Sequence, residues 1–225
     1  PVHMKKLPAD YIERLQTAFK LEASEVETLN PTSTDNKELI RWVRFGLGAL
    51  VFGQEADKVN RFFESDAFRW TANPKFGFSL FSTEYMRLYG LLNNRTGCMK
   101  GLLSPTAQAN YEKGMWEIAK ANSKLAEAQR GVWEMEGSEN HHLSSKVADL
   151  LAAQYLRNIP EYANQKYDDG STLAQQYEVR RAYFLKWFDE HAKRGQFTEA
   201  ASPSYQGHIL NALFNLRDFA EDPLL

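Results

Sequence analysis

The sequence predicts an all-α protein built from antiparallel helical hairpins, on three observations. Apolar residues recur with helical spacing along the whole chain, and the apolar faces that they form are broad. No segment shows the sustained alternation with β-branched residues that is typical of a strand. Two Ser-Pro pairs, Ser104-Pro105 and Ser202-Pro203, put a good N-cap before a residue favoured at the first helical position.

The N-terminal part of the chain is expected to hold four helices. Their apolar periodicity places them at residues 9–22, 36–52, 54–65 and 81–92. A polar connection, residues 30–35, separates the first two. Residues 66–79 are aromatic and irregular, and such a stretch between helices predicts either a binding surface or a lid tucked onto the core.

The C-terminal part is expected to hold four more helices. One begins at Ser104-Pro105 and runs to about Gln129, and a buried one runs from about Leu143 to just before Pro160. A turn at residues 168–171 caps a long helix that ends near Lys193. The last helix begins at Ser202-Pro203.

The wide apolar faces favour a partial α/α toroid, because each helix would pack on both an inner and an outer neighbour. No sequence repeat is visible, which disfavours a strict solenoid. Residues 1–4, Pro-Val-His-Met, resemble the remnant of an expression tag. We expect residues 5–225 to form a single helical domain, as in a piece of a longer protein.

Composition excludes several classes of function. The net charge of −2 argues against nucleic acid or a polybasic membrane surface as the main partner. No run of about 18 apolar residues exists, so no membrane span is expected. The single cysteine, Cys98, cannot form an intrachain disulfide and is expected to be packed. A native signal peptide would be missing from this sequence, and we expect a secreted or periplasmic protein.

Chemistry-bearing residues are concentrated in the segment Trp133–His142, between two long helical patterns. Gly137 is expected to end the preceding helix and Ser138 to cap the next one. Asn140 and His141 would then lie in a first turn, where free N–H groups and the helix dipole favour anions. An amide donor beside an imidazole could bind a carboxylate and move a proton, although both residues are also common at helix starts without any chemical role.

A second helix start carries Tyr205, two residues past Pro203, with His208 one turn further along. If the helix at residues 171–193 runs back between them, the two helix starts lie at the same end of the fold. We therefore expect Asn140, His141 and Tyr205 to line one cleft, with Tyr205 within hydrogen-bonding or one-water reach of His141.

An Asn, a His and a Tyr in one cleft suit the eliminative cleavage of a uronate polysaccharide. Amide donors neutralise the substrate carboxylate, a His or Tyr removes the α-proton, and a Tyr returns a proton to the leaving oxygen. The expected substrate-binding residues, with a basic group for acidic sugars among them, are Trp133, Glu139, His142, Arg180 and His208.

The segment Gly137–Leu143, with 150–153 after it, resembles the Asn-His helix start of α/α-toroid polysaccharide lyases such as alginate and heparinoid lyases. Residues 200–205 and 210–213 resemble the Tyr-bearing helix that follows. The resemblance covers roughly residues 100–225. It implies Asn140 as the carboxylate neutraliser, His141 and Tyr205 as base or acid, and an acidic polysaccharide or oligosaccharide as partner. We expect neither a cofactor nor a metal. The chain is shorter than a complete toroid, and the arginine of the family has no unique candidate.

Three alternatives stay open. Glu134, Glu136 and Glu139 could supply the two carboxyl groups of a glycoside hydrolase, although clustered Glu near a helix end are more often solvated. His141 and His142 could bind zinc with Glu139, but the i, i+4 histidine pair of a helical metal site is missing. The chain could also be a non-catalytic glycan-binding or scaffold domain.

Overall fold

The computed structural model describes residues 9–33, 35–66, 68, 81–135, 137–195 and 202–225. Within these ranges every regular element is a helix, and the only extended pairing is an isolated bridge between Lys166 and Thr172. The predicted all-α class is confirmed. Trp70 and most of the aromatic stretch at 66–79 lie outside the described residues, and the described Phe68 is buried in the core.

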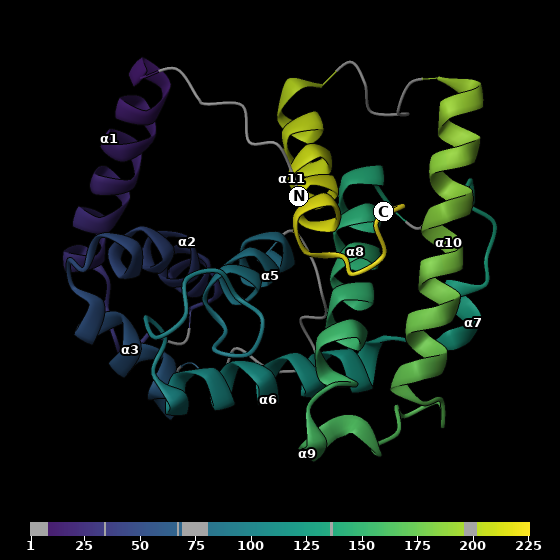
Figure 1. The fold of residues 1–225 in the computed structure, drawn as a ribbon, viewed down its shortest axis with the longest axis horizontal. Helices are drawn as coiled ribbons and strands as arrows, with labels where there is room; N and C mark the ends of the chain where they lie inside the picture. The colour runs from purple at the N-terminus through teal and green to yellow at the C-terminus, as the bar shows by residue number, and fades with distance from the viewer. Residues whose placement is uncertain (1–8, 34, 67, 69–80, 136, 196–201) are drawn as a thin grey trace.

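The helices follow the predicted order along the chain (Figure 1). Their bounds are α1 (Ala9–Glu25), the 3₁₀ turn η1 (Val26–Thr28), α2 (Asn36–Phe52), α3 (Ala56–Glu64), α5 (Phe81–Leu92), α6 (Pro105–Asn122), α7 (Leu125–Ala128), α8 (Glu139–Leu156), α9 (Pro160–Ala163), α10 (Leu173–Arg194) and α11 (Pro203–Phe219). The short helices α7 and α9 were not expected, because a single turn shows no apolar period.

Both Ser-Pro pairs begin helices as expected. The Ser104 hydroxyl accepts a hydrogen bond from the backbone N–H of Ala107 at 3.1 Å, and Ser202 accepts one from Tyr205 at 3.5 Å. Each serine satisfies a backbone donor that the first helical turn leaves without a partner.

The start of α8 differs from the prediction in one detail. Ser138 occupies the N-cap position with an extended backbone, but its side chain caps no backbone N–H. Its hydroxyl instead donates to Oδ1 of Asn140 at 2.9 Å. Gly137 has a positive φ of 72°, and the helix before it has already ended at Ala128.

The helix that begins at Pro105 ends seven residues earlier than the predicted Gln129, at Asn122 (129 − 122 = 7). Ser123 leaves the helical conformation, and its hydroxyl donates to the Asp149 carboxylate at 2.5 Å. A tertiary contact to α8 therefore ends α6 at a point where no glycine or proline marks the boundary.

Helices α8, α10 and α11 lie side by side, with α8 contacting both of the others (Figure 1). Helices α8 and α11 begin at the same end, and α10 runs in the opposite direction. Helix α5 packs against both α8 and α11. Helix α6 crosses α8 near the C-terminal end of α8 and also contacts α3. This arrangement confirms the expected directions of the three C-terminal helices.

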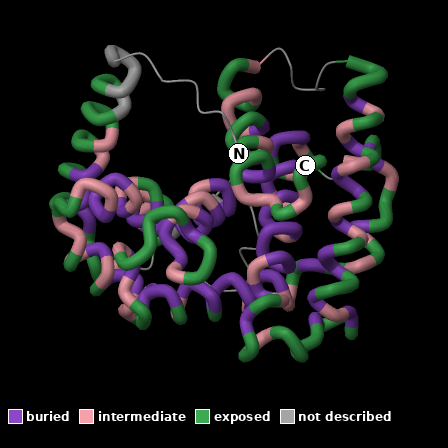
Figure 2. Tube along the Cα trace, viewed as in Figure 1, coloured by how far each residue is buried: buried purple, intermediate pink, exposed green. Residues whose placement is uncertain are grey.

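Helix α8 is deeply buried along most of its length, as the purple segments of Figure 2 show. Small and aliphatic residues at 150–153 are fully enclosed, so neighbouring helices approach α8 closely. The side chains of Trp42, Trp116 and Trp187 are at most 4% exposed and belong to the core.

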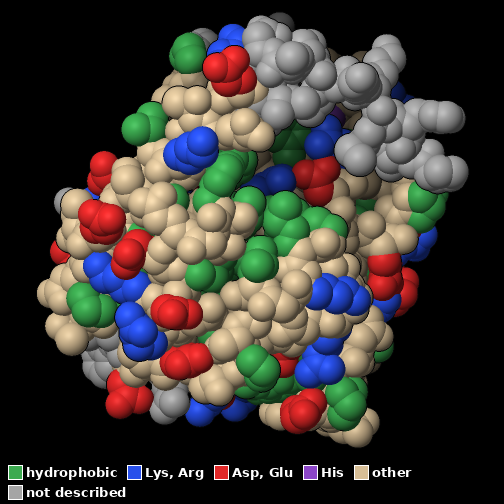
Figure 3. All heavy atoms as spheres, turned by 60° about the vertical axis from the view of Figure 1, so that its left-hand side comes forward, with side chains coloured by type: hydrophobic (Ala, Val, Ile, Leu, Met, Phe, Trp, Pro, Cys, Tyr) green, Lys and Arg blue, Asp and Glu red, His purple; other side chains and the backbone are tan. Residues whose placement is uncertain are grey.

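The described surface carries both signs of charge. On the face in Figure 3, acidic and basic side chains are interspersed, in keeping with the net charge of −2. Cys98 is exposed, so the expectation that it packs in the core is wrong; it lies in the polar loop after α5. Among the described residues, no helix has both the length and the apolar character needed to cross a membrane.

Candidate functional site

The three residues expected to be catalytic lie on the first turns of α8 and α11. His141 is exposed and Tyr205 is 48% exposed, at the end of the molecule where both helices begin (Figure 1). Asn140 is only 2% exposed and accepts the hydrogen bond from Ser138. The His141 and Tyr205 side chains make no hydrogen bond to each other in the described part of the chain.

The structure pairs the neighbouring histidine instead. Nε2 of His142, on α8, lies 3.0 Å from the hydroxyl of Tyr183, on α10. Tyr183 is 6% exposed and His142 is partly buried. The antiparallel packing of α8 against α10 brings the two residues together across 41 positions of sequence.

Burial and nearby cations determine the charge state of this pair. The pKa of His142 is lowered to about 4. Burial is the largest cause, and the positive charges of Lys146 and Arg130 act in the same direction. Burial raises the pKa of Tyr183 to about 12. At neutral pH a neutral imidazole therefore faces a protonated phenol.

Lys146 lies one turn after His142 on α8, and its ammonium donates to the backbone carbonyl of Glu127 at 3.2 Å. Burial lowers the pKa of this lysine, with Arg180 and Arg130 acting in the same direction and the carboxylates of Asp149 and Glu127 opposing them. An added anion would relieve this repulsion between cations. The surroundings of His142 thus favour a carboxylate beside a group that accepts protons.

The low pKa of His142 has a consequence for stability. Its folded-state value, about 4, lies below the 6.5 of an unperturbed histidine. Between these values the unfolded chain binds the proton more tightly, so the free energy of unfolding falls as the pH falls from about 6.5 towards 4. Because His142 is partly exposed, we expect this group to contribute a loss of only about 1–2 kcal/mol.

Urea unfolding of the wild type and of His142→Gln across this pH range tests that contribution. Other groups titrate alike in both chains, so the difference between the two curves isolates His142. The wild type should lose more stability on acidification than the variant. Parallel curves would contradict the lowered pKa.

Arg180 does not face a substrate site. It is 2% exposed, and its Nη1 lies 2.7 Å from the Asp149 carboxylate, while its Nε donates to Gln176 at 3.0 Å. A charged residue at a core position must find such partners inside the protein. The expectation that Arg180 holds an acidic sugar is therefore wrong. The cations that act on His142 are Lys146 and Arg130.

Apart from His142 and Arg180, the residues expected to bind substrate lie in three different environments. Trp133 is 38% exposed, stacks on His191 with 4.4 Å between ring centroids, and donates to Glu190 at 3.3 Å. Glu139 is buried, at 4% exposure. His208 faces α5, where its charge opposes the burial that raises the pKa of the Glu84 carboxyl.

Reasoning from sequence missed Tyr183 and Lys146. Tyr183 lies within the apolar pattern of the long helix α10, although a buried tyrosine hydroxyl usually needs a partner. Lys146 carries no distinguishing sequence signal, because charged residues are common on the polar faces of helices. Within the described ranges, no group of three or more His, Cys, Asp or Glu side chains is placed to hold a metal ion.

Comparison of the chain with protein families, curated protein sequences and solved structures finds no match. Function is therefore inferred from the geometry and chemistry of the site.

Proposed function

We propose that the chain is a polysaccharide-lyase-like domain that cleaves uronate-containing polysaccharides by β-elimination. The observation that carries this proposal is the contact of 3.0 Å between His142 and Tyr183, with a neutral imidazole at physiological pH and the cations of Lys146 and Arg130 beside it. The pair supplies a proton acceptor and a proton donor, and the cations suit a substrate carboxylate.

The proposed reaction needs no oxidant and no water. The phenolic oxygen of Tyr183 takes the proton from C5 of the uronate while its own proton passes to Nε2 of His142. The electron pair of the C–H bond forms a double bond between C4 and C5, and the C4–O bond breaks. The leaving oxygen keeps the electrons of that bond, and the His142–Tyr183 pair returns one proton to it.

The residues expected from the sequence have a place in this proposal. His141 and Tyr205 lie at the end where α8 and α11 begin, and we propose that they contact neighbouring sugars or share the proton transfer. Asn140 is buried, so it would act by fixing the first turn of α8. Because the substrate is a polysaccharide, we also propose a location outside the cytoplasm.

We further propose that the helices form part of an α/α toroid. Helices α8 and α11 run in parallel, contact each other and would be inner helices, and the antiparallel α10 would be an outer one (Figure 1). In such a layer the starts of successive inner helices open on one end, where a polymer can bind across them.

Incubation of the chain with a panel of uronate polymers tests the function. Elimination introduces a conjugated double bond, so we expect a rise in ultraviolet absorbance together with new reducing ends on at least one polymer. New reducing ends without that absorbance would show that the chain is a glycoside hydrolase and not a lyase. Binding to a polymer without any product would leave a non-catalytic glycan-binding domain.

A further inference from the structure

A cavity of about 500 Å³ lies at the other end of α8, between the C-terminal ends of α5, α8 and α11. Tyr155 and Gln154 line it from α8, Tyr89 from α5 and Phe219 from α11, and Arg95 reaches it from the loop after α5. Its volume suits a small ligand, and its walls combine aromatic rings with a few polar groups, as binding sites commonly do.

The loop that carries Arg95 is held by the side chain of a buried residue, Asn93. Oδ1 of Asn93 accepts from the backbone N–H groups of Arg95 at 3.1 Å, Thr96 at 2.7 Å and Gly97 at 3.3 Å. Its Nδ2 donates to the carbonyl of Tyr89 at 2.8 Å. The arginine is therefore positioned by the fold before any ligand arrives.

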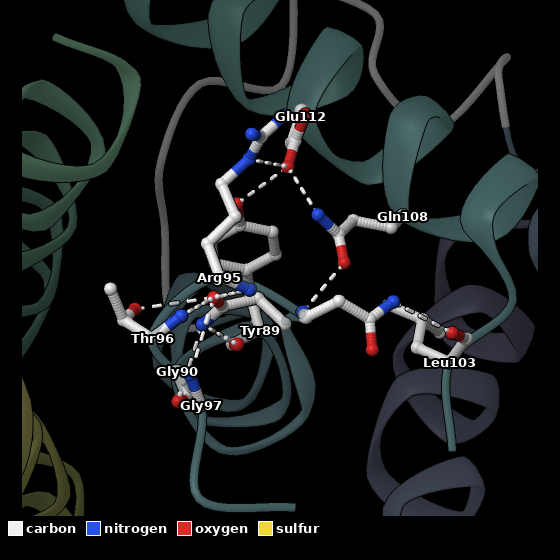
Figure 4. A network of polar contacts seen from close by, with 10 residues as sticks. Tyr89, Gly90, Arg95, Thr96, Gly97, Leu103, Gln108 and Glu112 are labelled. Atoms are coloured by element: carbon white, nitrogen blue, oxygen red, sulfur yellow. Dashed lines mark hydrogen bonds and ion pairs between the residues drawn. The ribbon is translucent and has the colours of Figure 1, made fainter. Parts of the chain in front are cut away.

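One edge of the Arg95 guanidinium is used inside the protein and the other is open. Nε donates to Oε1 of the buried Glu112 at 3.3 Å, an oxygen that also accepts from Tyr89 and Gln108 (Figure 4). The two Nη groups of Arg95 make no hydrogen bond to the described residues. A planar guanidinium fixed in this way presents donors that match a carboxylate.

Tyr155 contributes a polar group without a partner. Its hydroxyl is buried and forms no hydrogen bond with any residue that the structure describes. Buried hydroxyl groups are normally satisfied, and Tyr155 lines the cavity, so its hydroxyl is the group there that still lacks a partner among the described residues. Together with Arg95 it suits a molecule that has both a carboxylate and a hydroxyl group.

The carboxylates at this cavity are already neutralised. Asp218 pairs with Arg87 at 3.1 Å, and Glu221 pairs with Arg157. Arg95 also borders a second cavity of about 450 Å³, but that one is lined by Glu161, whose carboxylate makes no ion pair with the described residues and disfavours an anion there. The first cavity is therefore the better place for a negatively charged ligand.

We propose that this cavity binds a small hydroxylated carboxylate of the hexuronate class, with its carboxylate on the Nη groups of Arg95 and a hydroxyl group on Tyr155. The choice of hexuronate rests on the proposed function, since a uronate polymer would supply it. The site is separate from the His142–Tyr183 pair, because Tyr155 lies 13 positions after His142 on α8, a rise of about 20 Å.

Titration calorimetry of the full chain with glucuronate or galacturonate tests this proposal. Arg95→Gln should weaken the binding by about 10- to 100-fold, because a charged hydrogen-bonded pair is lost. Arg61→Gln is the matched control, since it removes the same charge from an exposed position on α3 that borders neither cavity. The corresponding neutral hexose should bind more weakly than the uronate by a similar factor.

A second variant, Tyr155→Phe, guards against a folding defect in Arg95→Gln. It removes a hydroxyl without a described partner, so the thermal unfolding temperature should be retained while uronate affinity falls. Equal binding of hexose and uronate, or full affinity in both variants, would overturn the proposal. Uronate binding that Arg95→Gln weakens would support it even if no polymer is cleaved, so its outcome is distinct from that of the proposed function.

Discussion

Replacing His142 with alanine is expected to lower the rate of polymer cleavage by about 10²- to 10⁴-fold, the range for loss of a positioned proton-transfer group. Tyr183→Phe should cause a loss of similar size, because it removes only the hydroxyl that contacts Nε2 of His142. Since the two residues act as one unit, the double variant should be little slower than either single one. Initial rates on the best polymer of the panel measure all three.

The adjacent histidine provides the matched control. His141 is exposed and, unlike His142, makes no contact with Tyr183. His141→Ala should therefore lower the rate by much less than His142→Ala does. If His141→Ala and Tyr205→Phe remove activity while His142→Ala keeps it, the proton transfer belongs to the helix starts and the His142–Tyr183 pair has a structural role.

The second large effect concerns stability. Asp149→Ala is expected to lower the free energy of unfolding by about 3–5 kcal/mol, because it leaves the guanidinium of Arg180 buried without its charged partner. For a chain of this size the unfolding temperature should fall by about 10 °C. Urea unfolding and calorimetry measure the change, and a loss below about 1 kcal/mol would contradict it.

A double variant separates the unpaired charge from simple loss of packing. Asp149→Leu with Arg180→Met replaces the ion pair with apolar groups of similar size, and it should recover most of the stability lost in Asp149→Ala. Asp149 also accepts from Ser123, so recovery should be incomplete by about the value of one hydrogen bond, ~1 kcal/mol.

The helices were largely predictable because their signals are local. The period of apolar residues located α5 at residues 81–92, and the Ser-Pro pairs located the first residues of α6 and α11. The early end of α6 was not predictable, since it depends on the contact of Ser123 with Asp149 on a helix that comes later in the chain. The residues around Ser123 in the sequence do not indicate such a contact.

The candidate site was predictable as a region but not as a set of contacts. The segment from Trp133 to His142 was singled out by its composition, and His142 was named, but its partner Tyr183 is 41 residues away. Which histidine meets that tyrosine depends on how α8 and α10 are rotated about their own axes. The burial of Arg180 has the same origin, because only the packed helices show that it faces Asp149.

Helix α8 also has a mechanical consequence. It is a single uninterrupted helix of 18 residues that carries His142 near its beginning and Tyr155 near its end. A helix resists compression along its axis, so a molecule that pushes on the last turn moves the first turn as well. A slide of α8 along its axis shifts His142 past Tyr183 on the neighbouring helix and so changes the alignment of their 3.0 Å contact. Filling the cavity and moving a proton would then be reciprocally linked, each changing the equilibrium of the other by the same factor.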